Sequence, residues 1–194
     1  MNDLSTSDRI INASILLFSQ KGYDAVTTKE IARKAGVCEM TLFRHFENKR
    51  NLFEKAFENY VFIPKFKTLF ESQLSGELEA DLLRISCCYQ DTLAKNQQLI
   101  LMQFKNNELT SEVEAPLSKF PNELKKLLMK YLVDMRNKGF VKENPEVLAI
   151  NFLAFNFGIF MMFIVNKHLT KDIDINTFLM SYVKKVVNAQ AQNF

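Results

Sequence analysis

The sequence predicts an all-α protein of about nine helices, in which a small N-terminal domain precedes a larger helical one. Apolar residues recur at steps of three and four along most of the 194 residues, which is the period of helices with one buried face. Only 5 glycines and 4 prolines interrupt this pattern, as expected for long helices joined by short loops. Hydrophobic residues make up 47% of the chain, enough for a buried core, so we expect a globular protein.

The N-terminal domain is expected to begin with a helix over residues 7–21. Its buried stripe is formed by Ile10, Ala13, Leu17 and Phe18. Gly22 follows this stripe, and glycine commonly ends a helix in the left-handed conformation. We therefore expect the first helix to stop at Gly22 with a left-handed cap.

Two short helices around a tight turn are expected next. Thr27 and Glu30 have the spacing of a capping box, in which the hydroxyl accepts a backbone N–H and the carboxylate reaches back to the cap residue. Gly36 tolerates the positive φ of a sharp break, and a helix over about residues 38–46 follows, with Asn48 placed to cap the helix after it. This pattern matches a helix-turn-helix, whose second helix can lie in the major groove of DNA.

The second helix of this motif has an outward face suited to DNA. Leu42 and Phe46 share the side that must pack on the core. The opposite side carries Met40, Thr41, Arg44 and His45, with Phe43 at its edge. Arginine can bond guanine or phosphate, and apolar side chains can touch thymine methyls. Residues 21–55 add eight Lys and Arg against five Asp and Glu, in a chain whose net charge is +3.

Residues 8–56 resemble the TetR/AcrR family of bacterial transcriptional regulators. The segments IINASILLFSQKGYDAVT, TTKEIARKAGV and TLFRHFENKRNLF carry the resemblance, together with a length near the family norm. We expect a helix-turn-helix DNA-binding domain over residues 1–47 and a helical regulatory, ligand-binding and dimerisation domain over residues 48–194. The resemblance implies that DNA contacts fall on Thr28, Lys29, Glu39, Met40, Thr41, Phe43, Arg44, His45 and Lys49.

Two positions depart from the family's pattern. The cap of the recognition helix is Cys38 where serine is usual, and cysteine is a poorer cap. Phe43 stands where a tyrosine usually bonds a phosphate. A helix N-terminus favours the thiolate form, so a redox- or electrophile-sensing regulator that uses Cys38 is an alternative function.

Composition and motifs exclude several other classes of protein. Cys38, Cys87 and Cys88 have no zinc-binding spacing and form no disulfide framework, which indicates a reducing compartment. The N-terminal segment MNDLSTSDR is polar and is no signal peptide, so we expect a cytoplasmic protein. The chain has only two histidines, His45 and His168, and no phosphate loop, nucleophile elbow or His/Cys ligand pair. We predict no catalytic residues, no metal, no cofactor and no enzymatic activity.

The second domain is predicted from helical stripes that are separated by breaks. A fourth helix starts after Asn48, and Pro64 is expected to end or kink it. Further helices are expected over about residues 66–74, 77–96, 97–107 and 124–138, whereas residues 110–116 are acidic and expected to form a turn.

The last two helices are predicted to form a homodimer interface. The stretch VLAINFLAFNFGIFMMFIV after Pro145 is apolar nearly all round, so it is either buried or membrane-spanning. We predict burial, because Asn151 and Asn156 interrupt the run and it falls short of the roughly 20 residues that cross a bilayer. One subunit has too little surface to cover such a helix. We expect it and the helix from about Asp174 to pair with their copies through Phe152, Phe155, Ile159, Phe163, Phe178, Tyr182 and Val186.

The second domain is also rich in phenylalanine and methionine, which either pack as ordinary core or line a cavity of adaptable apolar groups. Regulators that this chain resembles commonly bind a small molecule between their middle helices. The candidate lining residues, which suit a small hydrophobic or aromatic ligand, are Phe62, Phe66, Phe70, Met102, Phe104, Met129 and Phe155. If the cavity is filled instead, the protein is a ligand-independent dimeric DNA binder.

The predicted function is a DNA-binding transcriptional regulator, a repressor that a small hydrophobic ligand releases from a palindromic operator. DNA favours the conformation in which two recognition helices fit successive major grooves, roughly 34 Å apart. A ligand that favours another spacing lowers the affinity for DNA. The helix after Asn48 joins the two domains and is expected to carry the shift.

Overall fold

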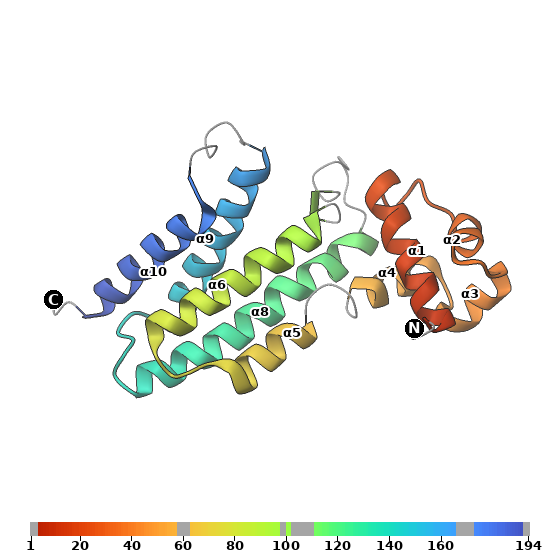
Figure 1. Cartoon of the computed structure of the whole chain (residues 1–194). Coiled ribbons are helices and arrows are strands. Elements are labelled where there is room, and N and C mark those ends of the chain that lie inside the picture. Colours follow the sequence, from red (N-terminus) through yellow and green to blue (C-terminus); the bar gives the residue numbers. More distant parts are fainter. Residues whose placement is uncertain (1–3, 58–62, 98–99, 102–110, 166–172, 192–194) are drawn as a thin grey trace. The chain divides into compact units, whose positions relative to one another are not determined.

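The computed structural model describes residues 4–57, 63–97, 100–101, 111–165 and 173–191, and the regular elements within those ranges are all helices (Figure 1). This confirms the predicted all-α fold. The helices are α1 (Thr6–Lys21), α2 (Thr28–Ala35), α3 (Glu39–Phe46), α4 (Lys49–Phe57), α5 (Ile63–Thr68), a π-helical turn (Leu69–Gln73), α6 (Leu78–Lys95), α8 (Ser111–Asn137), α9 (Pro145–Val165) and α10 (Ile175–Ala191).

The chain divides into two compact units. The first consists of Met1–Ile63 and Asn96–Pro121, and the second of Pro64–Lys95 and Asn122–Phe194. The first unit therefore extends past the predicted boundary between residues 47 and 48. The reason is the apolar face of α4, which packs on α1 and buries Leu52, Phe53 and Ala56.

An aromatic cluster holds the helices of the first unit together. The rings of Phe18 and Tyr23 lie 5.4 Å apart, and Phe53 contacts both edge-on at 5.3 and 5.0 Å. Edge-to-face packing at these distances is the favoured arrangement of aromatic pairs. The cluster joins the end of α1, the loop after it and α4, so the three-helix head and α4 share one core.

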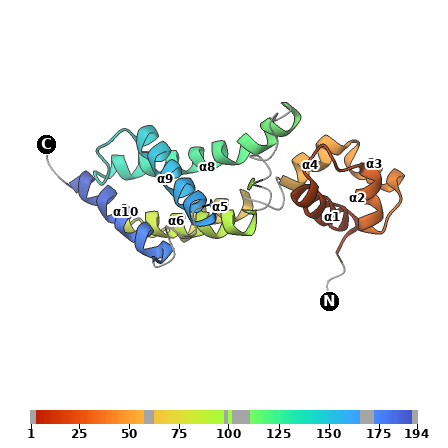
Figure 2. The same ribbon diagram turned by 90° about the horizontal axis from the view of Figure 1, so that it is seen from above.

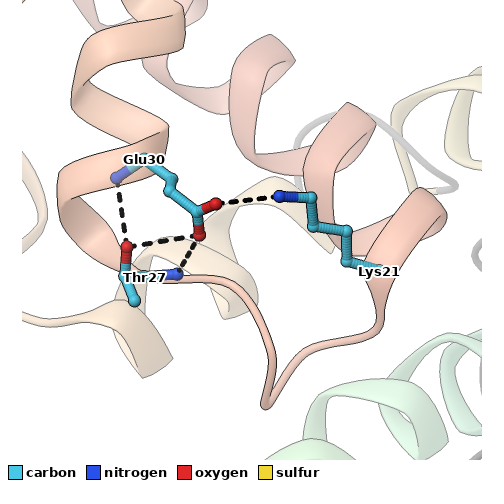
Figure 3. A network of polar contacts seen from close by, with 3 residues as sticks. All are labelled: Lys21, Thr27 and Glu30. Atoms are coloured by element: carbon cyan, nitrogen blue, oxygen red, sulfur yellow. Dashed lines mark hydrogen bonds and ion pairs between the residues drawn. The ribbon is translucent and has the colours of Figure 1, made fainter.

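The start of α2 is fixed by the predicted capping box (Figure 3). The Thr27 hydroxyl accepts the Glu30 backbone N–H at 3.2 Å, and the Glu30 carboxylate accepts the Thr27 backbone N–H at 3.0 Å. Lys21, in the last turn of α1, donates to the same carboxylate at 2.8 Å. The hydrogen bond from Lys21 and then that from the Thr27 backbone lower the pKa of Glu30 from 4.5 to about 2. The box therefore also links α2 to α1.

This lowered pKa predicts an acid-dependent loss of stability. A carboxylate with a depressed folded-state pKa stabilises the fold above its unfolded pKa of 4.5 and loses that contribution as the pH falls towards about 2. The difference in thermal midpoint between the natural protein and Glu30→Gln should shrink as the pH falls through this window. When both proteins also carry Lys21→Met, most of this pH dependence should disappear, because Lys21 is the main cause of the lowered pKa. A difference that stays constant down to pH 2 would contradict the assignment.

A buried carboxyl group organises the second unit. Asp81 of α6 is fully buried, and its Oδ1 accepts the backbone N–H and the hydroxyl of Ser75 at 2.7 and 2.9 Å. Its Oδ2 accepts the Gly76 N–H at 2.8 Å and the Tyr131 hydroxyl of α8 at 2.9 Å. Burial and then the hydrogen bond to Asp81 raise the pKa of Tyr131. Asp81 thus ties the turn before α6 to α8, while α9 and α10 lie beside α6 (Figures 1 and 2).

Some helix boundaries differ from the prediction. Gly22 has φ 86° and ψ 163°, so its φ is positive but its conformation is not the left-handed helical one, whereas Gly36 with φ 70° and ψ 37° is left-handed. The predicted turn over residues 110–116 is wrong, because α8 already begins at Ser111. Acidic residues favour a helix N-terminus as much as a turn. The predicted helix over residues 97–107 lies largely outside the described residues.

The predicted burial of α9 is only partly correct. Residues Pro145–Ile164 are long and apolar enough to cross a membrane by length and composition, so the argument that the run is too short was wrong. Only 33% of its apolar window is buried within the chain. One side packs inwards through Leu148, Ala149, Phe152, Asn156, Ile159 and Phe160. The other side exposes Val147, Ile150, Ala154, Gly158 and Met162 together with the polar Asn151.

Candidate nucleic-acid interface

The recognition helix α3 is held from one side only. Leu42 is fully buried and Phe46 is 2% exposed, so these two side chains anchor α3 in the core of the first unit. On the other side Met40 is 81% exposed and Phe43 is 42% exposed, and Arg44 is exposed as well. The structure therefore presents the outward face that the sequence predicted, including the apolar Met40 and part of the Phe43 ring.

The remaining predicted contacts of α3 lie at the margin of this face. Thr41 and His45 are half-buried. The Thr41 hydroxyl lies 3.1 Å from the Cys38 Sγ, and this hydrogen bond lowers the pKa of the Cys38 thiol. Cys38 makes no side-chain cap to the backbone of α3. The departure from serine at position 38 thus leaves the first backbone N–H groups of α3 without the usual side-chain acceptor.

Glu39 is fixed by a contact that the sequence did not predict. The Thr28 hydroxyl, in the first turn of α2, donates to the Glu39 Oε1 at 2.5 Å. Both residues were expected to contact DNA, but the bond between them crosses the turn between two helices, so helical spacing carries no signal for it. A pocket of about 480 Å³ adjoins this bond and is lined by Thr27, Lys29, Glu30, Ala32, Arg33, Val37 and Glu39. The lining therefore combines two cations, Lys29 and Arg33, with two carboxylates, Glu30 and Glu39.

Lys49, at the start of α4, does not extend freely into solvent. Its Nζ lies 4.2 Å from the centre of the Tyr23 ring and 3.5 Å from the Asp24 carbonyl oxygen, to which it donates. A cation over an aromatic face keeps its positive charge. Asn48 caps α4 as predicted, because its Oδ1 accepts the Asn51 N–H at 2.7 Å. The charge of Lys49 is therefore held at a set position beside α3.

The residues predicted to line a ligand cavity pack against other rings of the second unit. Phe66 contacts Tyr89, and Phe70 contacts Tyr131, each pair with ring centres 6.3 Å apart. Phe155 stacks on Tyr182 at 3.7 Å, and Met129 is half-buried. Phe62, Met102 and Phe104 lie outside the described residues. The ligand site stays a prediction.

Two of the residues predicted at the dimer interface are buried within the subunit and expose almost no surface to a partner. Phe152 is 1% exposed and Ile159 is 5% exposed, because both point into the subunit from the inner side of α9. We withdraw these two from the predicted interface. Five others remain half-buried, namely Phe155, Phe163, Phe178, Tyr182 and Val186. The described residues contain no group of three or more side chains that could hold a metal ion.

Comparison with known proteins decides the family. The family model for bacterial regulatory proteins of the tetR family matches residues 10–56. A curated relative, the uncharacterized HTH-type transcriptional regulator YvkB of Bacillus subtilis (strain 168), is 34% identical over 157 residues, which cover 80% of this chain and 82% of YvkB.

The chain belongs to the TetR family of bacterial transcriptional regulators. Within this family it is also similar to IcaR of Staphylococcus epidermidis, a negative transcriptional regulator of the biofilm operon icaADBC, at 38% identity over 52 residues, which cover 27% of this chain and 28% of IcaR. Its fold is similar to that of NalD of Pseudomonas aeruginosa, the secondary repressor of the MexAB-OprM multidrug efflux pump, with a TM-score of 0.73 at 20% identity. That match covers 93% of this regulator and 95% of NalD.

Proposed function

We propose that this TetR-family regulator is a cytoplasmic repressor that binds a two-fold symmetric DNA operator as a homodimer and leaves it when a small molecule binds its second unit. The observation that carries the DNA-binding part is the outward face of α3, where exposed Met40, Phe43 and Arg44 stand opposite the buried anchors. IcaR is a negative regulator and NalD a repressor, which supports repression as the outcome.

The side chains of this face have distinct roles in the proposed complex. Arg44 reads a guanine edge or binds a phosphate, and Met40 and Phe43 touch thymine methyls or sugars. The Thr28 hydroxyl holds the Glu39 carboxylate, which accepts a hydrogen bond from a cytosine amino group. Lys29 and Lys49 supply positive charge to the phosphates beside the groove.

Dimerisation supplies the second recognition helix. The exposed apolar side of α9, which carries Val147, Ile150, Ala154, Gly158 and Met162, is the surface that we assign to the partner subunit. The small residues Ala154 and Gly158 allow two helices to approach closely, and a Cβ added at Gly158 would meet nothing within 4 Å of this chain. Burying this side removes apolar area from water, which drives association.

The direct test of DNA binding compares Arg44→Ala with Lys49→Ala. Operator duplexes are first selected from random DNA with the natural full-length protein, and affinities are then measured by fluorescence anisotropy at several salt concentrations. Arg44→Ala should cost about 1–3 kcal/mol and relax base choice at one position of each half-site. Lys49→Ala should weaken binding to all sequences alike and reduce the salt slope by about one.

Lys185→Ala is the matched control, because Lys185 is an exposed lysine of α10 in the second unit. It should leave both the affinity and the salt slope unchanged. Unchanged binding by Arg44→Ala and Lys49→Ala together would remove the proposed docking face.

A further inference from the structure

In the described part of the second unit, two buried side-chain oxygens have no hydrogen-bond partner. Ser86 is fully buried and Gln90 is 8% exposed, and they lie one turn apart on α6. Neither the Ser86 Oγ nor the Gln90 Oε1 has a hydrogen-bond partner among the residues that the structure describes. Residues one turn apart share a face of a helix. The two oxygens therefore lie on one side of α6.

The orientation of the Gln90 side-chain amide is fixed by the hydrogen bonds that its nitrogen donates. The Gln90 Nε2 donates to the Asn156 backbone oxygen at 2.8 Å and to the Asn156 Oδ1 at 3.3 Å. Asn156 cannot turn its own amide, because its Nδ2 donates to the Phe152 carbonyl at 2.9 Å. Rotating the Gln90 amide would place its oxygen against two acceptors. The unpartnered atom is therefore the amide oxygen, Oε1, which can only accept a hydrogen bond.

Ser86 also differs from other hydroxyl groups of its kind. A helical serine or threonine commonly donates to a carbonyl in the preceding turn. Thr92, on the same helix, does so to Cys88 at 2.7 Å, and Ser14 does so to Ile11 at 2.7 Å. Nearly all buried polar atoms in native proteins have a partner, either in the protein, in water or in a ligand. Two exceptions one turn apart require a donor from a bound water or another bound molecule.

The surroundings indicate the class of that molecule. Among the residues whose side chains the structure describes, Asp81 is the single charged one that is buried, and all its bonds go to Ser75, Gly76 and Tyr131. A charged ligand would find no free counter-charge there, and burying an unpaired charge is costly. Of the helices packed against α6, α9 contributes Asn156, which bonds Gln90, and the other side chains that α9 and α10 bury are mostly apolar, among them Phe152, Leu179 and Val183.

We propose that Gln90 and Ser86 form the polar end of the ligand site in the second unit, which takes a neutral, mainly apolar molecule with one O–H or N–H group that donates to the Gln90 Oε1. The Ser86 hydroxyl bonds the same polar group or its neighbour. This proposal rests on the proposed function, in which a ligand of the second unit releases DNA. It replaces a purely apolar ligand by one that carries a single hydrogen-bond donor.

The test uses phenol and anisole, two neutral probes of the same ring of which only phenol donates a hydrogen bond. Each is titrated into ¹⁵N-labelled full-length protein. Phenol should shift the Gln90 side-chain amide signals and the Ser86 backbone amide, and should bind about tenfold more tightly than anisole, the ratio expected for one hydrogen bond. Equal affinities, or shifts that spare both residues, would overturn the proposal.

Two variants separate the site from general packing effects. Gln90→Met keeps the length of the side chain but removes the acceptor, so it should abolish the preference for phenol. Thr92→Val removes a buried hydroxyl of α6 that already has a partner, so the preference should survive. Ser86→Ala should raise the thermal midpoint of the ligand-free protein, whereas Thr92→Val should lower it. Equal losses in these last two variants would show that the Ser86 hydroxyl is satisfied, against the proposal.

Measuring operator binding as well tells apart a failure of the assigned ligand site and a failure of the proposed ligand-induced release. If phenol binds at Gln90 and the operator is not released, the site stands and ligand-induced release is wrong. If hydrophobic compounds release the operator equally well from the natural protein and from Gln90→Met, release stands and the assigned site is wrong.

Discussion

Asp81→Ala is expected to lower the free energy of unfolding by about 3 kcal/mol or more, since hydrogen bonds to a carboxylate contribute roughly 1.5–3 kcal/mol each. The Asp81 carboxyl group accepts four such bonds from Ser75, Gly76 and Tyr131. Water can replace the carboxylate at the exposed Ser75, which limits the loss. The Tyr131 hydroxyl and the space left by the side chain have no such replacement. Urea unfolding followed by circular dichroism measures the change.

Two milder variants test this explanation. Asp81→Asn keeps one acceptor oxygen but turns an amide N–H₂ towards the Gly76 N–H or the Ser75 N–H, so its loss should be smaller than that of the alanine. Tyr131→Phe removes one bond and should cost about 1–2 kcal/mol. An order in which Tyr131→Phe costs more than Asp81→Ala would show that the Tyr131 hydroxyl, and not the carboxyl group, organises this part of the unit.

Ala154→Arg is expected to convert the proposed dimer into a monomer and to weaken operator binding about 100-fold or more. Ala154 lies at the middle of the exposed apolar side of α9, where an arginine would be buried without a partner charge in the assembled dimer. Two linked heads bind two half-sites far more tightly than one head binds one, by factors of roughly 10²–10⁴. Sedimentation velocity at micromolar concentration reports the first effect and fluorescence anisotropy the second.

Val133→Arg is the control for Ala154→Arg. Val133 of α8 is 44% exposed and belongs to the same unit, so an arginine there adds the same charge away from the assigned interface. The control should remain dimeric and bind the operator normally. If Ala154→Arg is folded and still dimeric, the partner subunit does not cover this side of α9.

The DNA-binding part could be predicted in detail because its signals are local. The capping box of Thr27 and Glu30, the left-handed Gly36 and the cap at Asn48 each depend on residues within one turn, and all three are found. The outward face of α3 follows from the helical period once Leu42 and Phe46 are placed inside. Solvent exposure of Met40 and Phe43 was predictable for the same reason.

The parts that could not be predicted depend on contacts between helices. The bond from Thr28 to Glu39 crosses the turn, the bond from Tyr131 to Asp81 joins residues 50 apart, and the contact of Gln90 with Asn156 joins residues 66 apart. Helix α9 shows a second limit. Because it is apolar all round, its sequence does not indicate which side faces the subunit, and Phe152 and Ile159 were placed on the wrong side.

The first unit consists of two separate segments of the chain, which bears on how ligand binding could reach the DNA-binding helices. The backbone passes from one unit to the other three times, at Ile63–Pro64, Lys95–Asn96 and Pro121–Asn122, and α8 runs through the third passage without a break. A proteolytic nick at Ile63–Pro64 would separate the segment that holds α1–α4 from the rest of the chain, and only its packing on residues 96–121 would then keep it in the first unit. In the proposed mechanism a rearrangement of the second unit can therefore pass to the first along three stretches of chain, and immobilising the segment after Asn48 alone leaves two of them free.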